Sequence, residues 1–209
     1  IISHNKAWNR EKPRVGVVKD YQFKGWYEGV MKLTEHEKNL TKANSSEVAR
    51  DFFIFILFTG MRRNEVLSLK WEDIDFEDKT FTVGKTKNHE GLKLPLTWLL
   101  LEVLERRKND NGNPYVFEGE KPNSHLSPPK KQIIKARELV GFHFTHHDLR
   151  RTFSTTAHRL NFGKYTLDRL INHKTQDSND ITARYVILDV EDLREPMNQI
   201  TDSIWSQIQ

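Results

Sequence analysis

A histidine and an arginine one helical turn apart give this sequence its clearest chemical signal. His147 and Arg150 stand at positions i and i+3 of the string THHDLRRT, so a helix would place both side chains on one face. A guanidinium can bind two phosphate oxygens at once, and an imidazole can exchange a proton or donate a hydrogen bond. The pair therefore suits a phosphoryl group. On its own, this spacing is more typical of a solvated helix face or a surface ion pair.

Two other segments supply residues that fit the same chemistry. The apolar run 52–58 ends in a Thr-Gly pair, which predicts a buried helix, a glycine stop and a second short helix. Arg62 would then lie at the start of the second helix, with Glu65 one turn later to orient or neutralise it. Downstream, the sequence adds a second histidine, His173, and a tyrosine, Tyr185.

This ordered series resembles the active-site motifs of the tyrosine recombinases, the phage-integrase family. That family combines a Thr-Gly-x-Arg-x-x-Glu box, a lysine on a β-hairpin, a His-x-x-Arg box, a His or Trp after Leu-x-x, and a C-terminal Tyr. The resemblance covers roughly residues 40–190, and five motifs in the right order are hard to obtain by chance. It implies a catalytic set, supported by Glu65, that consists of Arg62, Lys87, His147, Arg150, His173 and Tyr185.

At two of these positions, an adjacent residue of the same type could fill the same role. Arg62 is preferred to Arg63 because the family arginine follows Thr-Gly and one apolar residue. The His-x-Leu-Arg form favours His147 over His146, although helical spacing alone lets either reach the arginine that follows.

The hairpin lysine also has two candidates. Counting back from Pro95-Leu96, which ends the hairpin in the family's usual form, places Lys87 at the family position, and Lys85 stays open because the count is ungapped. One departure from the family concerns Asn172, which stands where Leu-Gly-His has its glycine. Asparagine can adopt the left-handed conformation that glycine usually supplies, so we keep His173 in its role.

Chain breakers and hydrophobic periodicity predict a mainly α fold with a small antiparallel β-sheet, like the DNA breaking-rejoining fold of the recombinase catalytic domain. Strands are expected at 74–76, 80–83 and 92–96, and a polar loop at 34–46. Helices are expected at 21–33, from 47 through the apolar run, and at 98–108, 128–140, 147–160, 164–172, 180–186 and 190–205.

The expected domain organisation is one catalytic domain, residues 19–209, with a C-terminal helical tail from about residue 189. Residues 1–18 are basic and irregular, and resemble the linker from a missing N-terminal core-binding domain. The tail has apolar residues at near-helical spacing. It would either dock on a neighbouring protomer or fold back onto its own core.

Composition is compatible with this interpretation and excludes some other classes. The 209 residues contain no cysteine, which excludes disulfides and thiolate zinc sites and makes an intracellular, cytoplasmic setting the natural expectation. No apolar stretch is long enough to span a membrane. The net charge of +4 is modest, and solvated helices alone would explain it. With the motifs, the basic residues expected to bind DNA are Arg63, Lys85, Lys130, Lys131 and Arg151.

The resemblance implies a site-specific recombinase that cleaves and rejoins DNA through a 3′-phosphotyrosyl intermediate, and so integrates or excises a phage or mobile element. Two arginines would do what a divalent cation does in nucleases, so no metal and no cofactor is expected. The expected partners are double-stranded DNA, other protomers assembled on it as a tetramer, and accessory DNA-bending factors. Two alternatives stay open: a type IB topoisomerase-like activity and a non-catalytic DNA-binding protein.

Overall fold

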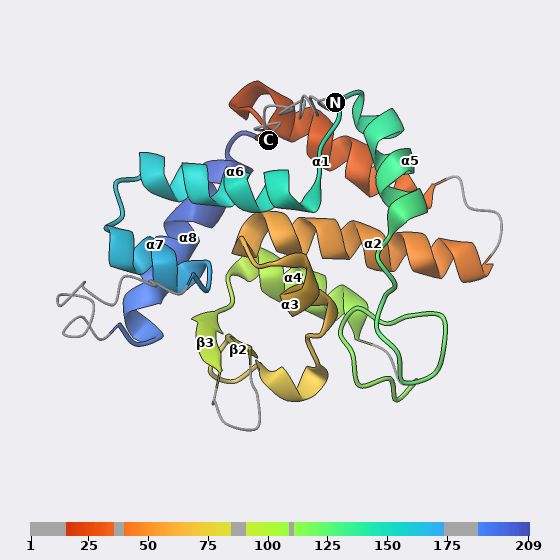
Figure 1. The fold of residues 1–209 in the computed structure, drawn as a ribbon, viewed down its shortest axis with the longest axis horizontal. Helices are drawn as coiled ribbons and strands as arrows, with labels where there is room; N and C mark the ends of the chain where they lie inside the picture. Colours follow the sequence, from red (N-terminus) through yellow and green to blue (C-terminus); the bar gives the residue numbers. More distant parts are fainter. Residues whose placement is uncertain (1–15, 36–39, 85–90, 109–110, 174–187) are drawn as a thin grey trace, which may run out of the picture.

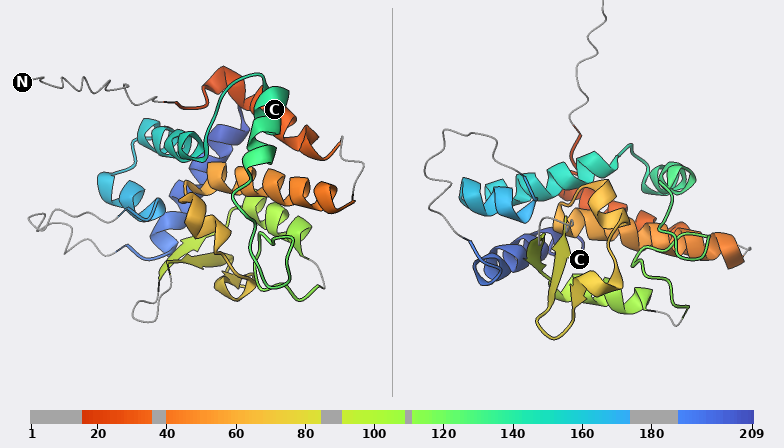
Figure 2. Two further views of the ribbon diagram at one scale, coloured as in Figure 1. Left: turned by 45° about the vertical axis from the view of Figure 1, so that its right-hand side comes forward. Right: turned by 60° about the horizontal axis from the view of Figure 1, so that its bottom comes forward.

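Helices make up most of the structure, and a small sheet lies at one edge (Figure 1 and Figure 2). The computed structural model describes residues 16–35, 40–84, 91–108, 111–173 and 188–209, and only the backbone of 40–44. The α-helices are α1 (Phe23–Met31), α2 (Leu40–Thr59), α3 (Arg63–Leu67), α4 (Trp98–Arg107), α5 (Lys130–Val140), α6 (His146–Arg159), α7 (Lys164–Leu170) and α8 (Glu191–Trp205). Three 3-10 turns are η1 (Asp20–Gln22), η2 (Lys32–Thr34) and η3 (Trp71–Asp73). The predicted fold class is confirmed.

Helix α2 is the centre of the core. Every side chain from Phe52 to Phe58 is fully buried, so this part of the helix must be covered on all sides. Helices α1 and α6 lie above it in Figure 1 and α4 lies below, and α8 also contacts it. The predicted core helix is therefore confirmed. None of the described helices is both long and apolar enough to cross a membrane.

The predicted sheet is confirmed as a three-stranded antiparallel sheet in the order β1-β2-β3. Its strands are β1 (Ile74–Asp75), β2 (Thr80–Val83) and β3 (Leu92–Pro95), with Phe81 of β2 opposite Leu94 of β3. Both of these side chains are fully buried, which fixes the register, since a one-residue slip would expose them. The hairpin residues 85–90 lie outside the described part of the chain.

The predicted loop at 34–46 was wrong over its second half, because α2 begins at Leu40 and not at Glu47. Serine and threonine disfavour a helix interior by only a few tenths of a kcal/mol each, so tertiary contacts can override them. Two such contacts are present: Ser46 is buried, and the Ser45 hydroxyl accepts a 2.7 Å hydrogen bond from Nε2 of Gln132. The helix expected at 180–186 lies outside the described residues.

The C-terminal tail folds back onto its own core, which is the second of the two alternatives. The side chains of Leu193, Met197, Ile200 and Ile204 are fully buried, where α8 contacts α6, α7 and β3. Arg194 extends this contact, because its Nη2 lies 3.1 Å from Oδ1 of Asp78 in the β1–β2 turn. The apolar face of α8 is therefore used within one chain.

Residues 16–18 run along α6. The backbone N–H of Val18 donates to Oγ1 of Thr152 (2.8 Å), and Nη1 of Arg151 donates to the carbonyl of Gly16 (3.0 Å). A Cβ at Gly16 would lie 2.7 Å from the Asp148 carboxyl group, so only glycine fits this approach without movement. Residues 1–15 lie outside the described part, and the linker role of residues 1–18 stays a prediction.

Gly60, which ends α2, lies where a side chain should destabilise the fold. Its φ is +63°, and an added Cβ would lie 2.5 Å from Cδ1 of Phe153. Gly60→Ala should therefore lower the free energy of unfolding by at least about 1–2 kcal/mol, the cost of a left-handed alanine alone, and lower Tm by several degrees. Gly25→Ala is the matched control: it lies inside α1, nothing lies within 4 Å of its Cβ position, and it should stabilise by about 0.5–1 kcal/mol. Thermal denaturation followed by circular dichroism measures both, and equal stabilities would contradict the close contact at Gly60.

Candidate active site

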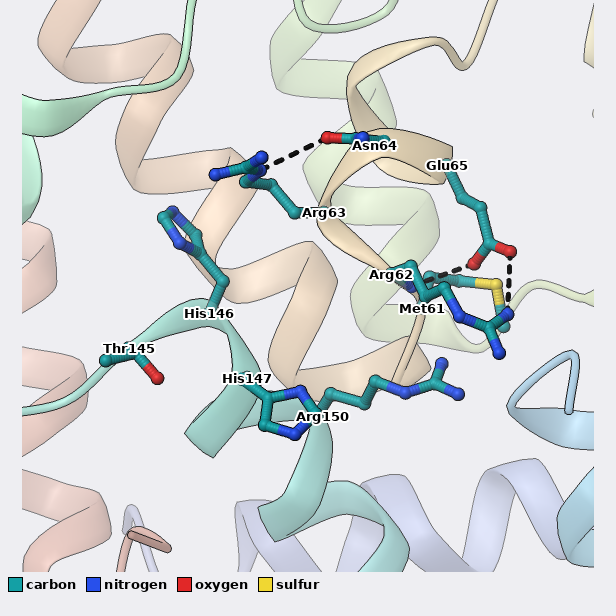
Figure 3. Close-up of a pocket in the computed structure, with 9 residues that line it drawn as sticks. All are labelled: Met61, Arg62, Arg63, Asn64, Glu65, Thr145, His146, His147 and Arg150. Carbon is teal, nitrogen blue, oxygen red and sulfur yellow. Dashed lines mark hydrogen bonds and ion pairs between the residues drawn. The ribbon is translucent and has the colours of Figure 1, made fainter. Parts of the chain in front are cut away.

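The first arginine box and the His-x-x-Arg box meet at a single pocket. It lies where the start of α3 faces the N-terminal part of α6 (Figure 3). The volume is about 450 Å3. The pocket is lined by Met61, Arg62, Arg63, Asn64, Glu65, Thr145, His146, His147 and Arg150. Two motifs some 85 residues apart in sequence, at 62–65 and 147–150, therefore contribute to one concave surface.

Arg62 is the N-cap residue of α3 and is fixed by two acceptors. Its Nη1 donates to Oε1 of Glu65 (3.1 Å) and to the backbone carbonyl of Asn172 (2.7 Å). Glu65 also caps the start of the helix, since its Oε2 accepts from the backbone N–H of Arg62 at 2.8 Å. The carboxylate one turn along thus orients the arginine, as the spacing predicted. About half of the Arg62 side chain stays exposed.

Arg150 is held differently, by carbonyls and not by a carboxylate. Its Nη1 donates to the carbonyl of Gly60 (2.5 Å) and to that of Ile171 (2.8 Å). Burial, together with the nearby Arg62 charge, lowers the pKa of Arg150 to about 10. The guanidinium is still protonated at neutral pH. Because carbonyls carry no net charge, they position this cation without neutralising it.

The turn at Ile171-Asn172 connects both arginines and was only partly anticipated. Asn172 has φ +50°, which confirms that asparagine adopts the left-handed conformation here. Its carbonyl binds Arg62, the preceding carbonyl binds Arg150, and its Nδ2 donates to Oε1 of Glu65 at 2.8 Å. The asparagine in the glycine position was the signal for this turn. These three contacts were not predicted from the sequence.

The two adjacent histidines have different environments. His147 is exposed, lines the pocket and lies beside Arg150 (Figure 3). His146 packs against Phe52 and Phe53, with ring centroids 5.6 Å from each. Burial, and then the Arg63 and Arg137 charges, lower the pKa of His146 to about 4, so it is neutral at pH 7. The geometry supports His147 as the histidine that can exchange protons with a bound group.

Of the other predicted catalytic residues, His173 lies within the described part of the chain, and it does not line the pocket. His173 follows the turn that binds both arginines, but its side chain is 55% exposed and its Nδ1 lies 3.5 Å from Oδ1 of Asp168. Lys85, Lys87 and Tyr185 lie outside the described residues, so their roles stay predictions.

Four of the five basic residues expected to bind DNA lie within the described structure, in three different places. Arg63 lines the pocket, whereas Lys130 and Lys131 are exposed in the first turn of α5 and do not. Arg151 is engaged within the protein, through Gly16 and a 3.4 Å contact with Oδ1 of Asp148. Their role in binding DNA stays a prediction.

The pocket has the chemistry of an anion site. Three guanidiniums line it against one carboxylate, Glu65, and that carboxylate is paired with Arg62. Planar guanidiniums with free N–H groups suit a tetrahedral phosphoryl group, and the exposed His147 can donate a hydrogen bond or a proton to it. Among the described residues, no three His, Asp or Glu side chains lie together as a metal site requires.

Comparison with known proteins identifies the family. The model of the phage integrase family matches residues 29–191, so the chain belongs to that family. It is 29% identical over 182 residues to the tyrosine recombinase XerA of Pyrococcus furiosus, covering 82% of this chain and 63% of that protein. It is 28% identical over 159 residues to the prophage integrase IntF of Escherichia coli, covering 73% of this chain and 32% of IntF. The chain thus spans less than two thirds of these relatives.

Solved structures share the fold at low sequence identity. The XerH site-specific recombinase bound to its difH substrate superposes with a TM-score of 0.63 at 21% identity, over 88% of this chain and 53% of that one. The catalytic core of lambda integrase gives a TM-score of 0.53 at 16% identity, over 76% of this chain and 96% of that one. The described fold is therefore that of a recombinase catalytic domain.

The burial of His146 should make the free energy of unfolding depend on pH. Its folded pKa of about 4 lies below the ordinary value of 6.5, so the unfolded state binds a proton that the folded state does not. The stability that depends on His146 is complete above pH 6.5 and is lost as the pH falls toward 4. Between pH 7 and pH 5, the free energy of unfolding of the wild type should therefore fall by about 2 kcal/mol more than that of His146→Phe.

Urea denaturation at several pH values measures this difference. His147→Phe changes the neighbouring but exposed histidine and leaves the buried His146 ring in place, so it should keep the loss of stability that His146 causes. If the two variants behave alike, burial of His146 does not control its protonation.

Proposed function

We propose that this chain is the catalytic domain of a site-specific DNA recombinase, which cleaves and rejoins DNA through a 3′-phosphotyrosyl intermediate. The observation that carries the proposal is the position of Arg62 and Arg150, whose guanidiniums reach the same end of one pocket, beside the exposed His147 (Figure 3). Membership of the phage integrase family supports it. Integration or excision of a phage or mobile element is the role we assign to the whole protein.

The reaction exchanges one phosphodiester bond for another. The phenolic oxygen of Tyr185 attacks the scissile phosphorus, a bond to that oxygen forms, and the bond to the 5′-oxygen breaks. Lys87 gives its proton to the departing 5′-oxygen, and His147 accepts the phenolic proton or returns it on reversal. A 5′-hydroxyl of a second strand then attacks the phosphotyrosine and releases Tyr185. Because the bond energy is conserved in the covalent intermediate, no nucleotide cofactor is needed.

The arginines stabilise the transition state. Negative charge spreads onto the two non-bridging oxygens as the phosphorus becomes five-coordinate, and two guanidiniums fixed in advance bind those oxygens without further reorganisation. The Gly60 and Ile171 carbonyls fix Arg150, and Glu65 with the Asn172 carbonyl fixes Arg62. We assign His173 to hydrogen-bond the same phosphate after the DNA has bound.

The partners follow from this chemistry. Double-stranded DNA is the substrate, and strand exchange between two duplexes requires several protomers, for which we propose a tetramer. Residues 1–18 would connect this domain to an N-terminal core-binding domain that grips the opposite face of the duplex. Two linked domains of modest affinity then act as one tight binder through their effective concentration.

The nucleophile can be tested by covalent capture. Tyr185→Phe removes one oxygen, so the variant should fold and bind DNA but form no covalent complex with nicked duplexes drawn from a random-sequence pool. Tyr21→Phe removes the same oxygen from a tyrosine that is 77% exposed, and should capture DNA as the wild type does. Sequencing the captured DNA also maps the crossover site. A covalent adduct formed by the Tyr185→Phe protein would reject the assignment.

The general acid can be tested with a modified leaving group. A 5′-bridging sulfur leaves as a thiolate of pKa about 8.5 and scarcely needs a proton. Lys87→Ala should therefore cleave ordinary DNA poorly, by a factor of about 100 or more, and cleave the 5′-phosphorothiolate nearly as well as the wild type. Lys85→Ala is the matched control, and single-turnover cleavage is the measurement. If Lys85→Ala shows this pattern instead, the proton donor is Lys85; equal impairment on both substrates would show that Lys87 acts by binding.

A further inference from the structure

Positive charge is unevenly distributed in the pocket. Arg62 and Arg150 extend to one end, where Glu65 neutralises one of the two charges, whereas Arg63 extends to the other end, toward His146 (Figure 3). Three arginines and one carboxylate line the pocket, so these side chains together carry a charge of +2. A single phosphodiester carries one negative charge, so one phosphate at the Arg62–Arg150 end leaves the charge of Arg63 uncompensated.

Arg63 is available to a ligand. Its side chain is exposed, and its Nε donates to Oδ1 of the neighbouring Asn64 at 3.2 Å. This bond uses one of the five guanidinium N–H groups and orients the planar group. No carboxylate within the described ranges forms an ion pair with Arg63, in contrast to Arg62.

The surroundings of Arg63 favour an anion and not a second cation. Burial, and then the Arg63 and Arg137 charges, lower the pKa of the neighbouring His146, so this ring is neutral at pH 7. A neutral ring neither competes with Arg63 for water-exposed anions nor repels it. The other lining residues at this end, Asn64 and Thr145, are polar and uncharged.

We propose that Arg63 binds a second phosphodiester group of the cleaved DNA strand, next to the scissile phosphate. Successive phosphates of one strand are separated by more than the roughly 3.4 Å that they advance along the duplex axis, because the strand also winds around that axis. The side chains of Arg62 and Arg63 extend to opposite ends of one pocket, so they can contact two different phosphates of one strand (Figure 3). This inference rests on the proposed function, because it takes the Arg62–Arg150 end as the scissile position.

The test is a chemical double-mutant cycle on the full natural protein. Methylphosphonate, which is uncharged, replaces the scissile phosphate or one of its two flanking phosphates in the mapped crossover duplex. Equilibrium binding is measured in the Tyr185→Phe background, with Arg63 intact or changed to Gln. Neutralising one flanking phosphate should weaken binding about tenfold when Arg63 is present and less than twofold in Arg63→Gln. Arg63→Lys keeps the charge and should retain most of the effect.

Absence of coupling at both flanking positions, or coupling at the scissile phosphate alone, would overturn the proposal. The phosphate contact of Arg63 can be absent while the wild type still captures DNA covalently. Such a result would reject this inference and leave the proposed function intact.

A second arm of the test does not require the mapped crossover duplex. On a random-sequence duplex, Arg63→Gln should reduce the slope of log affinity against log salt by about 0.9, the contribution of one neutralised phosphate. Lys32→Gln lowers the net charge equally at an exposed residue outside the pocket, and should leave the slope unchanged. Equal falls in both variants, or no fall in either, would contradict a phosphate contact at Arg63. Unchanged thermal stability of Arg63→Gln would show that folding is not the cause.

Discussion

The central physical constraint in this structure is the need to hold a half-buried guanidinium without neutralising it. Arg150 loses hydration through burial and also lies near the Arg62 charge, and both effects lower its pKa. A carboxylate would offset that cost but would also cancel the charge that an anion needs. The protein instead uses two backbone carbonyls, from Gly60 and Ile171, which accept hydrogen bonds and leave the positive charge in place.

Much of the surrounding architecture supplies those carbonyls. Gly60 ends α2 in the left-handed conformation, and Asn172 follows α7 in the same conformation, at φ values of +63° and +50°. These two turns stop their helices where the carbonyls can reach the arginines. The buried aromatic run of α2 fixes the first turn, and the contact between α7 and α8 fixes the second. Core packing and anion binding are therefore coupled through two helix ends.

The features that the sequence predicted well are local. The Arg62–Glu65 capping pair, the glycine stop at Gly60 and the left-handed Asn172 each depend on residues within one helical turn. The strands were recognisable from their alternation and from the polar turns between them. The order of the family motifs indicated that segments far apart in the sequence belong to one site, which the spacing within each motif could not show.

The features that the sequence did not predict are long-range. The carbonyl contacts of Arg150 join residues 90 and 21 positions away, and carbonyls carry no signal in a residue pattern. Spacing could not separate His146 from His147, because the difference is the packing of one ring on Phe52 and Phe53. The start of α2 was misplaced because local propensity was outweighed by contacts at Ser45 and Ser46. The sequence could not predict whether the C-terminal tail packs on its own core or on a neighbouring protomer, because an apolar face does not specify what covers it.

A crystal structure of the Tyr185→Phe protein, in its full natural length, bound to crossover-site DNA would show how the two arginines contact the scissile phosphate. We expect Arg62 and Arg150 each to donate to a non-bridging oxygen of one phosphate, at about 2.7–2.9 Å, while the Gly60 and Ile171 carbonyls keep their hydrogen bonds to Arg150. A complex in which the two arginines contact different phosphates, or in which Arg150 leaves its carbonyl partners to reach the DNA, would contradict this expectation.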